Sequence, residues 1–295
     1  MKFTVVIPTY NRSQFIIKTI QSVLNQSYTD FEVIVVDDGS TDNTEEAVKS
    51  IPDTRVFYYK KTNAERGAAR NFGTLKAKGE YVTFLDSDDL LYPEHLQDAS
   101  QLILKNNTPE AFHLGYEIKN EYGKTLYKID DLPSIANRIL IKGNTLSCLG
   151  VFLRNDIAVK NLFNENRLLS GLEDWELWLR IAVQFPIYTS NTITSTMINH
   201  DERSVLSIPK EEQIARFDVL FSLVLSNPLI TNYYKGSLNV FKSSCYSYIA
   251  LHLALAKKYK KDSISYLIKS IAQSPVSVFT RRFLAIIKHL VLGLG

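Results

Sequence analysis

The chain has 295 residues, of which 45% are hydrophobic and 22% are charged, and its net charge is +3. These proportions are ordinary for a folded globular protein and exclude a disordered chain, a collagen-like repeat and a disulfide scaffold. Because Cys148 and Cys245 are the only cysteines, a CxxC pair is excluded and a reducing compartment is the simplest interpretation. The first residues lack the apolar stretch of a secretory signal, and no apolar run is long enough to span a membrane. We therefore expect a cytoplasmic protein.

Charge is unevenly distributed along the chain. Residues 206–295 contain 12 lysine and arginine residues against 4 aspartate and glutamate residues, whereas residues 1–205 contain 22 against 27. A basic C-terminal third on an acidic body suggests a catalytic part followed by a docking part. A lysine-rich solvated helical surface fits the same numbers, and the sequence leaves both interpretations open.

The first hundred residues alternate between apolar strands and amphipathic helices. We predict strands at Phe3–Ile7, Phe31–Val36, Arg55–Tyr59 and Tyr81–Leu85. Intervening helices are predicted from Asn11 as N-cap to about Leu24, after Asp42, at Ala68–Lys78 and after Pro93. Continuously apolar strands separated by helices indicate a parallel sheet with both faces covered, and right-handed crossovers make it a doubly wound α/β unit.

From residue 111 the pattern changes. A hairpin is predicted from Ala111–Lys119 and Thr125–Ile129, followed by a strand at Val151–Arg154, a helix at Leu172–Val183 and a strand at Ile187–Ile198. After about Val205 the sequence is helical throughout. We therefore expect an α/β domain over residues 1–205 and an all-helical region over residues 206–295.

Carboxylates are concentrated where the fourth strand ends, at Asp86, Asp88 and Asp89. Open parallel sheets bind ligands beyond the carboxyl ends of their strands. Adjacent carboxylates repel one another unless a cation lies between them, and hard oxygen ligands suit Mg²⁺ or Mn²⁺. Helix capping explains one of the three carboxylates but leaves the other two unexplained. The pattern therefore favours a divalent cation site.

Glycine-rich phosphate loops are absent from the sequence. No GxGxxG follows the first strand, which disfavours a dinucleotide-dependent dehydrogenase, and no GxxxxGK[ST] occurs, which excludes a P-loop NTPase. Phosphate charge would then be neutralised by a metal and by arginines, for which Arg66 and Arg70 are available.

Five motifs occur in order along residues 2–205: VVIPTYNR, VIVVDDGSTD, ERGAARNFG, GEYVTFLDSDD and LEDWELWLR. Each is short, but their order and spacing are specific. Together they resemble the successive motifs of the inverting glycosyltransferases of family 2. The resemblance implies the GT-A fold, a nucleoside-diphosphate sugar donor, a divalent metal (Mn²⁺ or Mg²⁺) and single-displacement transfer with inversion at the anomeric carbon.

Position by position, the resemblance implies a nucleoside pocket lined by Pro8, Thr9 and Tyr10. Asp38 would accept a hydrogen bond from the base, most simply from N3–H of uracil, so a UDP-sugar is the expected donor. Its neighbour Asp37 fits better as a residue that stabilises the turn before Gly39.

The diphosphate and metal roles are implied in the same way. Arg70 would lie near the nucleotide, and Asp86 would contact the ribose or a metal-bound water. Asp88 would be the principal metal ligand, and Asp89 would support it or cap the next helix. His200 stands where many enzymes of this fold place a histidine that reaches the metal or the diphosphate, although an ordinary loop residue fits equally.

Acceptor-side roles fall on the last motif. Inverting transfer needs a general base, and Asp174 is the candidate because it begins a helix whose dipole favours its charged form. Glu173 would orient Asp174 or form part of the cap. From helix phase, Trp175 is expected to stack on an acceptor sugar, and Trp178 to lie in the core.

The end of the sequence, Val276–Leu294, combines apolar residues with arginine, lysine and histidine. Such a segment can lie on an anionic membrane surface as an amphipathic helix, or pack on the protein body or a second subunit. Lipid-linked acceptors, which the family resemblance implies, favour the membrane. The expected location is therefore cytoplasmic, on the inner face of the plasma membrane. No nucleic-acid partner is expected.

Two other functions are weighed against a glycosyltransferase acting on a glycan or lipid-linked hydroxyl. A sugar nucleotidyltransferase would need a glycine- and arginine-rich loop after the first strand, where Pro8-Thr9-Tyr10-Asn11 stands instead. A catalytically inactive nucleotide-sugar-binding protein would be expected to have lost Asp86, Asp88 or Asp174, and all are present.

Overall fold

The computed structural model describes residues 1–200 and 209–292, which divide into two compact units. The first holds Met1–Asn137 and the described residues from Thr145 to His200. The second holds Arg138–Asn144 and the described residues from Pro209 onward. The sequence did not predict that Arg138–Asn144 belongs with the helical unit.

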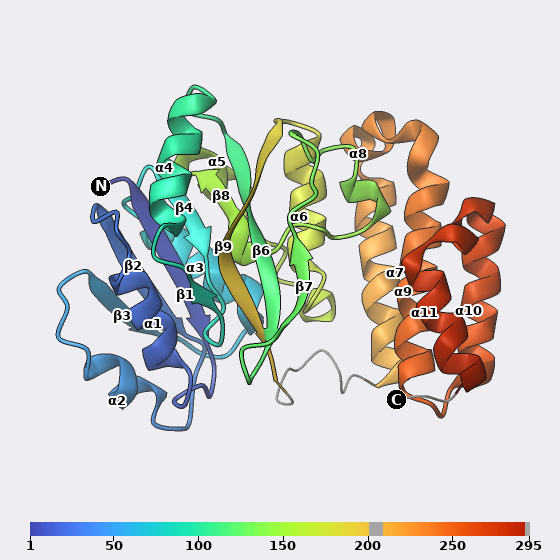
Figure 1. Cartoon of the computed structure of the whole chain (residues 1–295), viewed down its shortest axis with the longest axis horizontal. Coiled ribbons are helices and arrows are strands. Elements are labelled where there is room, and N and C mark those ends of the chain that lie inside the picture. The colour runs from blue at the N-terminus through green and yellow to red at the C-terminus, as the bar shows by residue number, and fades with distance from the viewer. Residues whose placement is uncertain (201–208, 293–295) are drawn as a thin grey trace. The chain divides into compact units, whose positions relative to one another are not determined.

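The first unit is built on a mixed sheet with strand order β3-β2-β1-β4-β8-β6-β9-β5 (Figure 1). Its first four strands are parallel and confirm the predicted doubly wound half. They are β1 (Phe3–Thr9), β2 (Phe31–Asp37), β3 (Val56–Lys60) and β4 (Tyr81–Phe84).

The second half of the sheet is mainly antiparallel. β8 (Val151–Arg154) pairs with β4, and β6 (Ala111–Asn120) pairs antiparallel with β8 and parallel with β9 (Ile187–Asn199). The short β5 (Leu90–Leu91) lies along β9, and β7 (Thr125–Ile129) forms the predicted hairpin with β6. Because β9 runs beside β5, its end returns to the segment that follows β4.

Both faces of the parallel strands are covered, which explains why β1 and β2 are buried along their whole length. Phe3, Val5 and Ile7 share a core with apolar residues of α1 (Ile16–Leu24) and α4 (His95–Lys105). Val6 faces the other side, where α3 (Glu65–Lys76) lies so close that a Cβ on Gly73 would clash with it. The unit also contains α2 (Thr44–Lys49), α5 (Asn155–Lys160) and α6 (Glu173–Ala182).

The second unit is helical, as predicted. It contains α7 (Lys210–Ser226), α8 (Pro228–Tyr233), α9 (Leu238–Leu255), α10 (Lys260–Gln273) and α11 (Arg281–Leu292) (Figure 1). Its core joins Ala250 and Ala254 of α9 to Leu267 of α10 and Ile286 of α11. Over the part of the chain that the structure describes, no helix is both long enough and apolar enough to cross a bilayer.

Candidate active site

The ends of the parallel strands meet, as predicted. Thr9 is in register with Asp37, and the Asp38 N–H donates to the Thr9 carbonyl at 2.8 Å. Pro8 and Thr9 are buried within β1, whereas Tyr10 is 47% exposed. Of the three residues predicted to line the nucleoside pocket, Tyr10 is therefore the one that presents its side chain to solvent.

Asn11 connects the loops after β1 and β2 instead of capping a helix. Its Oδ1 accepts from the Thr41 N–H at 2.8 Å, and its own N–H donates to Ser40 Oγ at 2.9 Å. The backbone of Asn11 is left-handed, with φ of 51°, a conformation that asparagine tolerates better than most residues. α1 begins at Ile16, so the predicted N-cap at Asn11 was wrong.

The two aspartates after β2 have different surroundings. Asp37 accepts from the Ser40 N–H at 2.7 Å and the Tyr58 hydroxyl at 2.6 Å, which confirms its turn role. Asp38 accepts from Lys61 Nζ at 2.6 Å and from the Ala64 N–H at 3.0 Å. Asp38 thus holds the segment between β3 and α3.

An ion network centred on a buried arginine joins three elements at the centre of the site. Arg70 of α3, only 2% exposed, donates to Asp86 Oδ1 at 2.6 Å and to Glu173 Oε1 at 2.8 Å. Burial alone would lower the pKa of Arg70, but neighbouring negative groups, Asp86 and Glu173 among them, outweigh it and raise the pKa. Arg66 lies 3.9 Å from Glu173 Oε1 and keeps 31% of its side chain exposed. Arg70 is therefore a bridge between carboxylates, and Arg66 is the more accessible cation.

Asp88 and His200, the two predicted metal ligands, lie together. Their Oδ2 and Nε2 atoms are 3.0 Å apart, and Arg12 Nε lies 3.7 Å from the same Oδ2. The adjacent Asp89 explains the placement, because its buried Oδ1 accepts from the Ile198 N–H at 2.9 Å and holds the end of β9 against the β4 turn.

This pair fits a divalent cation with few protein ligands. Two neighbouring ligands at about 2.1 Å on an octahedral cation would themselves lie about 3 Å apart. Within residues 1–200 and 209–292, no group of three histidine, cysteine or acidic side chains is arranged to hold a metal. Mg²⁺ and Mn²⁺ usually keep several positions for water and phosphate oxygens, so two protein ligands, an aspartate and a histidine, suit them.

Asp174 is partly exposed in the first turn of α6, where the helix dipole favours its carboxylate form. Its neighbour Glu173 is buried, held by Arg70 and by the Gly171 N–H at 2.5 Å. Asp174 therefore follows directly on a residue fixed by the central ion network.

Trp175 and Trp178 are both fully buried. This contradicts the expectation that Trp175 stacks on an acceptor sugar, which requires an exposed ring face. The two residues are three positions apart and so share one side of α6, which means that helix phase could not separate them.

His95 and His113, to which the sequence assigned no role, lie in the core of the first unit. Burial lowers the pKa of each to about 3. Both are therefore neutral near pH 7 and act as packing residues.

Some residues at the site were not singled out as candidates by sequence reasoning. Lys61 binds Asp38, Arg12 approaches Asp88, and Phe15 stacks on His200 with ring centroids 4.9 Å apart. Arg12 stands in the first motif and was within reach of inference. The position of Lys61 depends on the path of the chain after β3, and no motif in the sequence indicates that path.

Comparison with known proteins identifies similar sequences and structures. Residues 4–150 match the family model described as Glycosyl transferase family 2. The chain is 32% identical to the UDP-Glc:alpha-D-GlcNAc-diphosphoundecaprenol beta-1,3-glucosyltransferase WfgD of Escherichia coli, over 78% of this chain and 89% of that protein. Against three longer curated relatives from Rickettsia, it spans only 43%, 26% and 44% of their lengths.

Solved structures share the fold. S. aureus TarS 1–349 in complex with UDP-GlcNAc has a TM-score of 0.65 at 19% identity, over 92% of this chain and 91% of that one. The mannosyltransferase PcManGT from Pyrobaculum calidifontis, in complex with GDP-Man and Mn²⁺, has a TM-score of 0.61 at 18% identity, over 98% and 86%. The fold is of the GT-A type, and the chain belongs to glycosyltransferase family 2.

Proposed function

We propose that this enzyme transfers a sugar from a UDP-sugar to a hydroxyl group of a glycan or lipid-linked acceptor, with inversion and with Mn²⁺ or Mg²⁺ bound. The observation that carries the proposal is the Asp86–Arg70–Glu173 network, which joins the end of β4 directly to the helix that presents Asp174. The E. coli relative is named as a UDP-glucose-dependent enzyme acting on a diphosphoundecaprenol-linked sugar, which supports both the donor and the acceptor class.

Uridine recognition is assigned to Asp38 and the exposed Tyr10. A carboxylate has about four lone-pair sites, so Asp38 can accept from uracil N3–H while it keeps its bonds to Lys61 and Ala64. Tyr10, which is nearly half exposed, follows Thr9, whose carbonyl accepts from the Asp38 N–H, and it offers a ring for stacking on the base.

We expect UDP with Mn²⁺ to raise the melting temperature more than GDP with Mn²⁺ at equal concentration. A ligand at 100 times its dissociation constant stabilises the folded state by about 2.7 kcal/mol. A modest difference in affinity between UDP and GDP therefore gives a measurable difference in melting temperature. Differential scanning fluorimetry gives the comparison, and Asp38→Ala should lose the preference. A larger shift with GDP would reverse the assignment.

In the proposed reaction, the acceptor oxygen attacks the anomeric carbon as the bond from that carbon to the β-phosphate oxygen breaks. Asp174 takes the hydroxyl proton, and UDP leaves on the opposite face. Asp88 and His200 would hold the metal, which supplies charge neutralisation for the departing diphosphate. Arg66, which is partly exposed and lies 3.9 Å from Glu173 Oε1, would add positive charge to the site.

We also propose that α11 contacts an anionic bilayer. Its outward side carries Leu284 and Val291, which are 63% and 73% exposed, and Ile287 lies between them. Arg281 and Lys288 are exposed beside this apolar stripe. Ile286 packs α11 against the core of the unit. The exposed stripe is therefore a second apolar side of α11, separate from the side that packs. Apolar residues flanked by basic ones match the surface of anionic lipids.

Reversing two of these charges tests the membrane contact. Each basic residue near an anionic surface contributes about 1 kcal/mol, so Arg281→Glu with Lys288→Glu should lower partitioning into phosphatidylglycerol vesicles at least roughly 30-fold. The matched control reverses Lys105 and Lys124, two exposed lysines of the first unit. Sedimentation with vesicles measures the effect. Unchanged binding, or a dimer that Leu284→Ser dissociates, would mean that the stripe does not contact lipid.

A further inference from the structure

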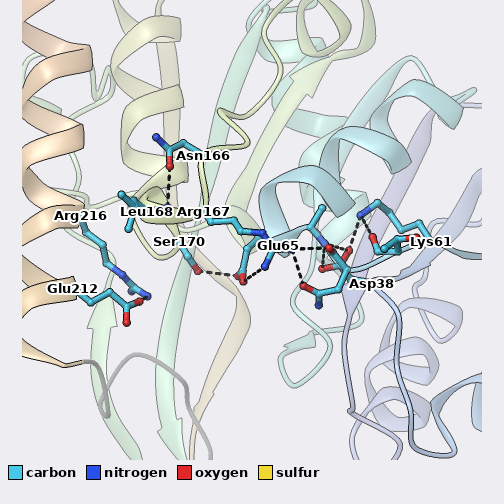
Figure 2. Close-up of polar contacts among 12 residues, drawn as sticks. Asp38, Lys61, Glu65, Asn166, Arg167, Leu168, Ser170, Glu212 and Arg216 are labelled. Carbon is cyan, nitrogen blue, oxygen red and sulfur yellow. Dashed lines mark hydrogen bonds and ion pairs between the residues drawn. The ribbon is translucent and has the colours of Figure 1, made fainter.

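The loop before α6, residues 163–171, is hydrogen-bonded to α3 and to the residues just before it. At one end, Asn71 exchanges two hydrogen bonds with the Phe163 backbone at 2.8 and 2.9 Å. At the other end, Ser170 Oγ donates to Glu65 Oε2 at 3.2 Å (Figure 2). Between them, Arg167 donates to the Asn63 carbonyl at 2.6 Å and lies 3.6 Å from Glu65 Oε1.

The residue just before α3, Ala64, is in turn hydrogen-bonded to Asp38. The Ala64 N–H donates to both carboxylate oxygens of Asp38, at 3.0 and 3.1 Å. Glu65 is the next residue, and its partner Ser170 is four residues before Asp174. Figure 2 shows Asp38, Glu65, Arg167 and Ser170 in this sequence of contacts. A short path of direct contacts therefore runs from the proposed nucleoside pocket to the segment that carries the proposed base.

Glu65 has an unfavourable backbone conformation in this path. Its φ is +75°, in the left-handed region, which is unfavourable for a residue other than glycine. Such a conformation persists only where surrounding contacts impose it. The contacts on either side are the Ala64 bond to Asp38 and the side-chain bond to Ser170.

The ion pair between Glu65 and Arg167 contributes little to the stability of the fold. The two side chains are 38% and 59% exposed, and ion pairs at such positions contribute little to folding. We propose that Glu65, together with Arg167, is a positioning residue that couples occupancy of the nucleoside pocket to the placement of residues 167–174. The proposal rests on the proposed function, because it takes Asp38 as the nucleoside contact and Asp174 as the base.

Hydrogen–deuterium exchange tests this coupling without a known acceptor. In the wild-type chain, UDP with Mn²⁺ should slow amide exchange both around Asp38 and Ala64 and across residues 166–174. In Glu65→Asn, protection around Asp38 should persist and protection of 166–174 should be lost. Asparagine tolerates the left-handed backbone but is too short to reproduce the contact with Ser170, so the change isolates the side chain. Arg167→Ala should behave in the same way.

Arg154→Ala is the matched control, because Arg154 is a partly exposed arginine paired with Glu110 and Asp156. With UDP and Mn²⁺, this variant should show the same protection from amide exchange as the wild type, both around Asp38 and across residues 166–174. Equal protection of 166–174 in Glu65→Asn, or its absence in the wild type while the Asp38 region is protected, would overturn the coupling alone. No protection around Asp38 in the wild type would instead overturn the nucleoside pocket on which the proposal rests.

Turnover gives a second readout once an acceptor is in hand. Misplacement by about 1 Å can cost 10²-fold in rate, so Glu65→Asn should lower kcat by roughly 10- to 100-fold while the UDP dissociation constant changes less than about twofold. Glu65→Gln, which keeps the acceptor for Ser170 and loses the charge beside Arg167, should recover part of the rate. A Glu65→Asn enzyme with wild-type kcat would overturn the positioning role.

Discussion

Asp174→Asn is expected to lower the rate of sugar transfer about 10²- to 10⁴-fold, the usual loss when a general base is removed. The carboxylate takes a proton only as the new glycosidic bond forms, so its contribution belongs to the transition state and not to the bound ground state. An asparagine of the same shape can still accept from the Trp175 N–H, as Asp174 Oδ1 does at 2.7 Å. Folding stability should therefore change little.

Donor affinity should survive the same change, because the proposed donor contacts are Asp38, Asp88 and the arginines. The decisive comparison measures turnover and UDP affinity on one preparation. Asp156→Asn is the matched control, since Asp156 also stands in the first turn of a helix, α5. A mutant that transfers sugar at nearly the wild-type rate would leave Asp174 as an ordinary helix-start carboxylate. Glu173 would not easily replace it as the base, because Arg70 and the Gly171 N–H already hold it.

Asp88→Asn is expected to abolish the part of UDP binding that depends on Mn²⁺. Removing a partner that merely supports a metal ligand costs about 10- to 100-fold in metal affinity, and loss of the charged ligand itself should cost at least as much. The amide keeps the volume of the side chain, so the fold should remain. Calorimetry with and without Mn²⁺ separates the metal-dependent part from the rest.

His200 offers an independent check on the same site, because its Nε2 lies 3.0 Å from Asp88 Oδ2. His200→Ala should weaken the Mn²⁺-dependent binding as well, whereas Asp156→Asn should leave it intact. If Asp88→Asn binds UDP with the wild-type response to Mn²⁺, then Asp88 is not a metal ligand, and its contacts with His200 and Arg12 serve only to hold the loop.

The parallel half of the sheet was predictable because its determinants are local. β1 and β2 are mostly apolar and buried along their whole length, and Asp37 stabilises its turn through its own near neighbours. The family resemblance suggested a metal role for Asp88 and left His200 open between that role and an ordinary loop residue. The physical cause of their approach, the bond from Ile198 to Asp89, joins residues 109 positions apart. That kind of contact has no signature in the sequence.

Physical reasons also explain which sequence predictions were wrong and which residues were not identified. Asn11 has the side chain of an N-cap, but it binds the Thr41 N–H of another loop, and the helix starts later. Trp175 was expected at the acceptor from helix phase, yet α6 is buried on the side that carries it. Glu65 and Arg167 were not identified because their roles depend on how two loops lie against each other.

We expect this chain to break the bond between the sugar and the β-phosphate of a UDP-sugar. Phosphorus NMR of the nucleotide product tests it most directly, with a panel of UDP-sugars, Mn²⁺, pyrophosphate and candidate glycan and lipid-linked acceptors. The expected product is UDP, and Asp174→Asn should form it at least about 100-fold more slowly. Formation of UTP and sugar 1-phosphate would indicate a nucleotidyltransferase, and a bound donor that is never cleaved would indicate a binding protein. Either result would contradict sugar transfer from a UDP-sugar by this chain.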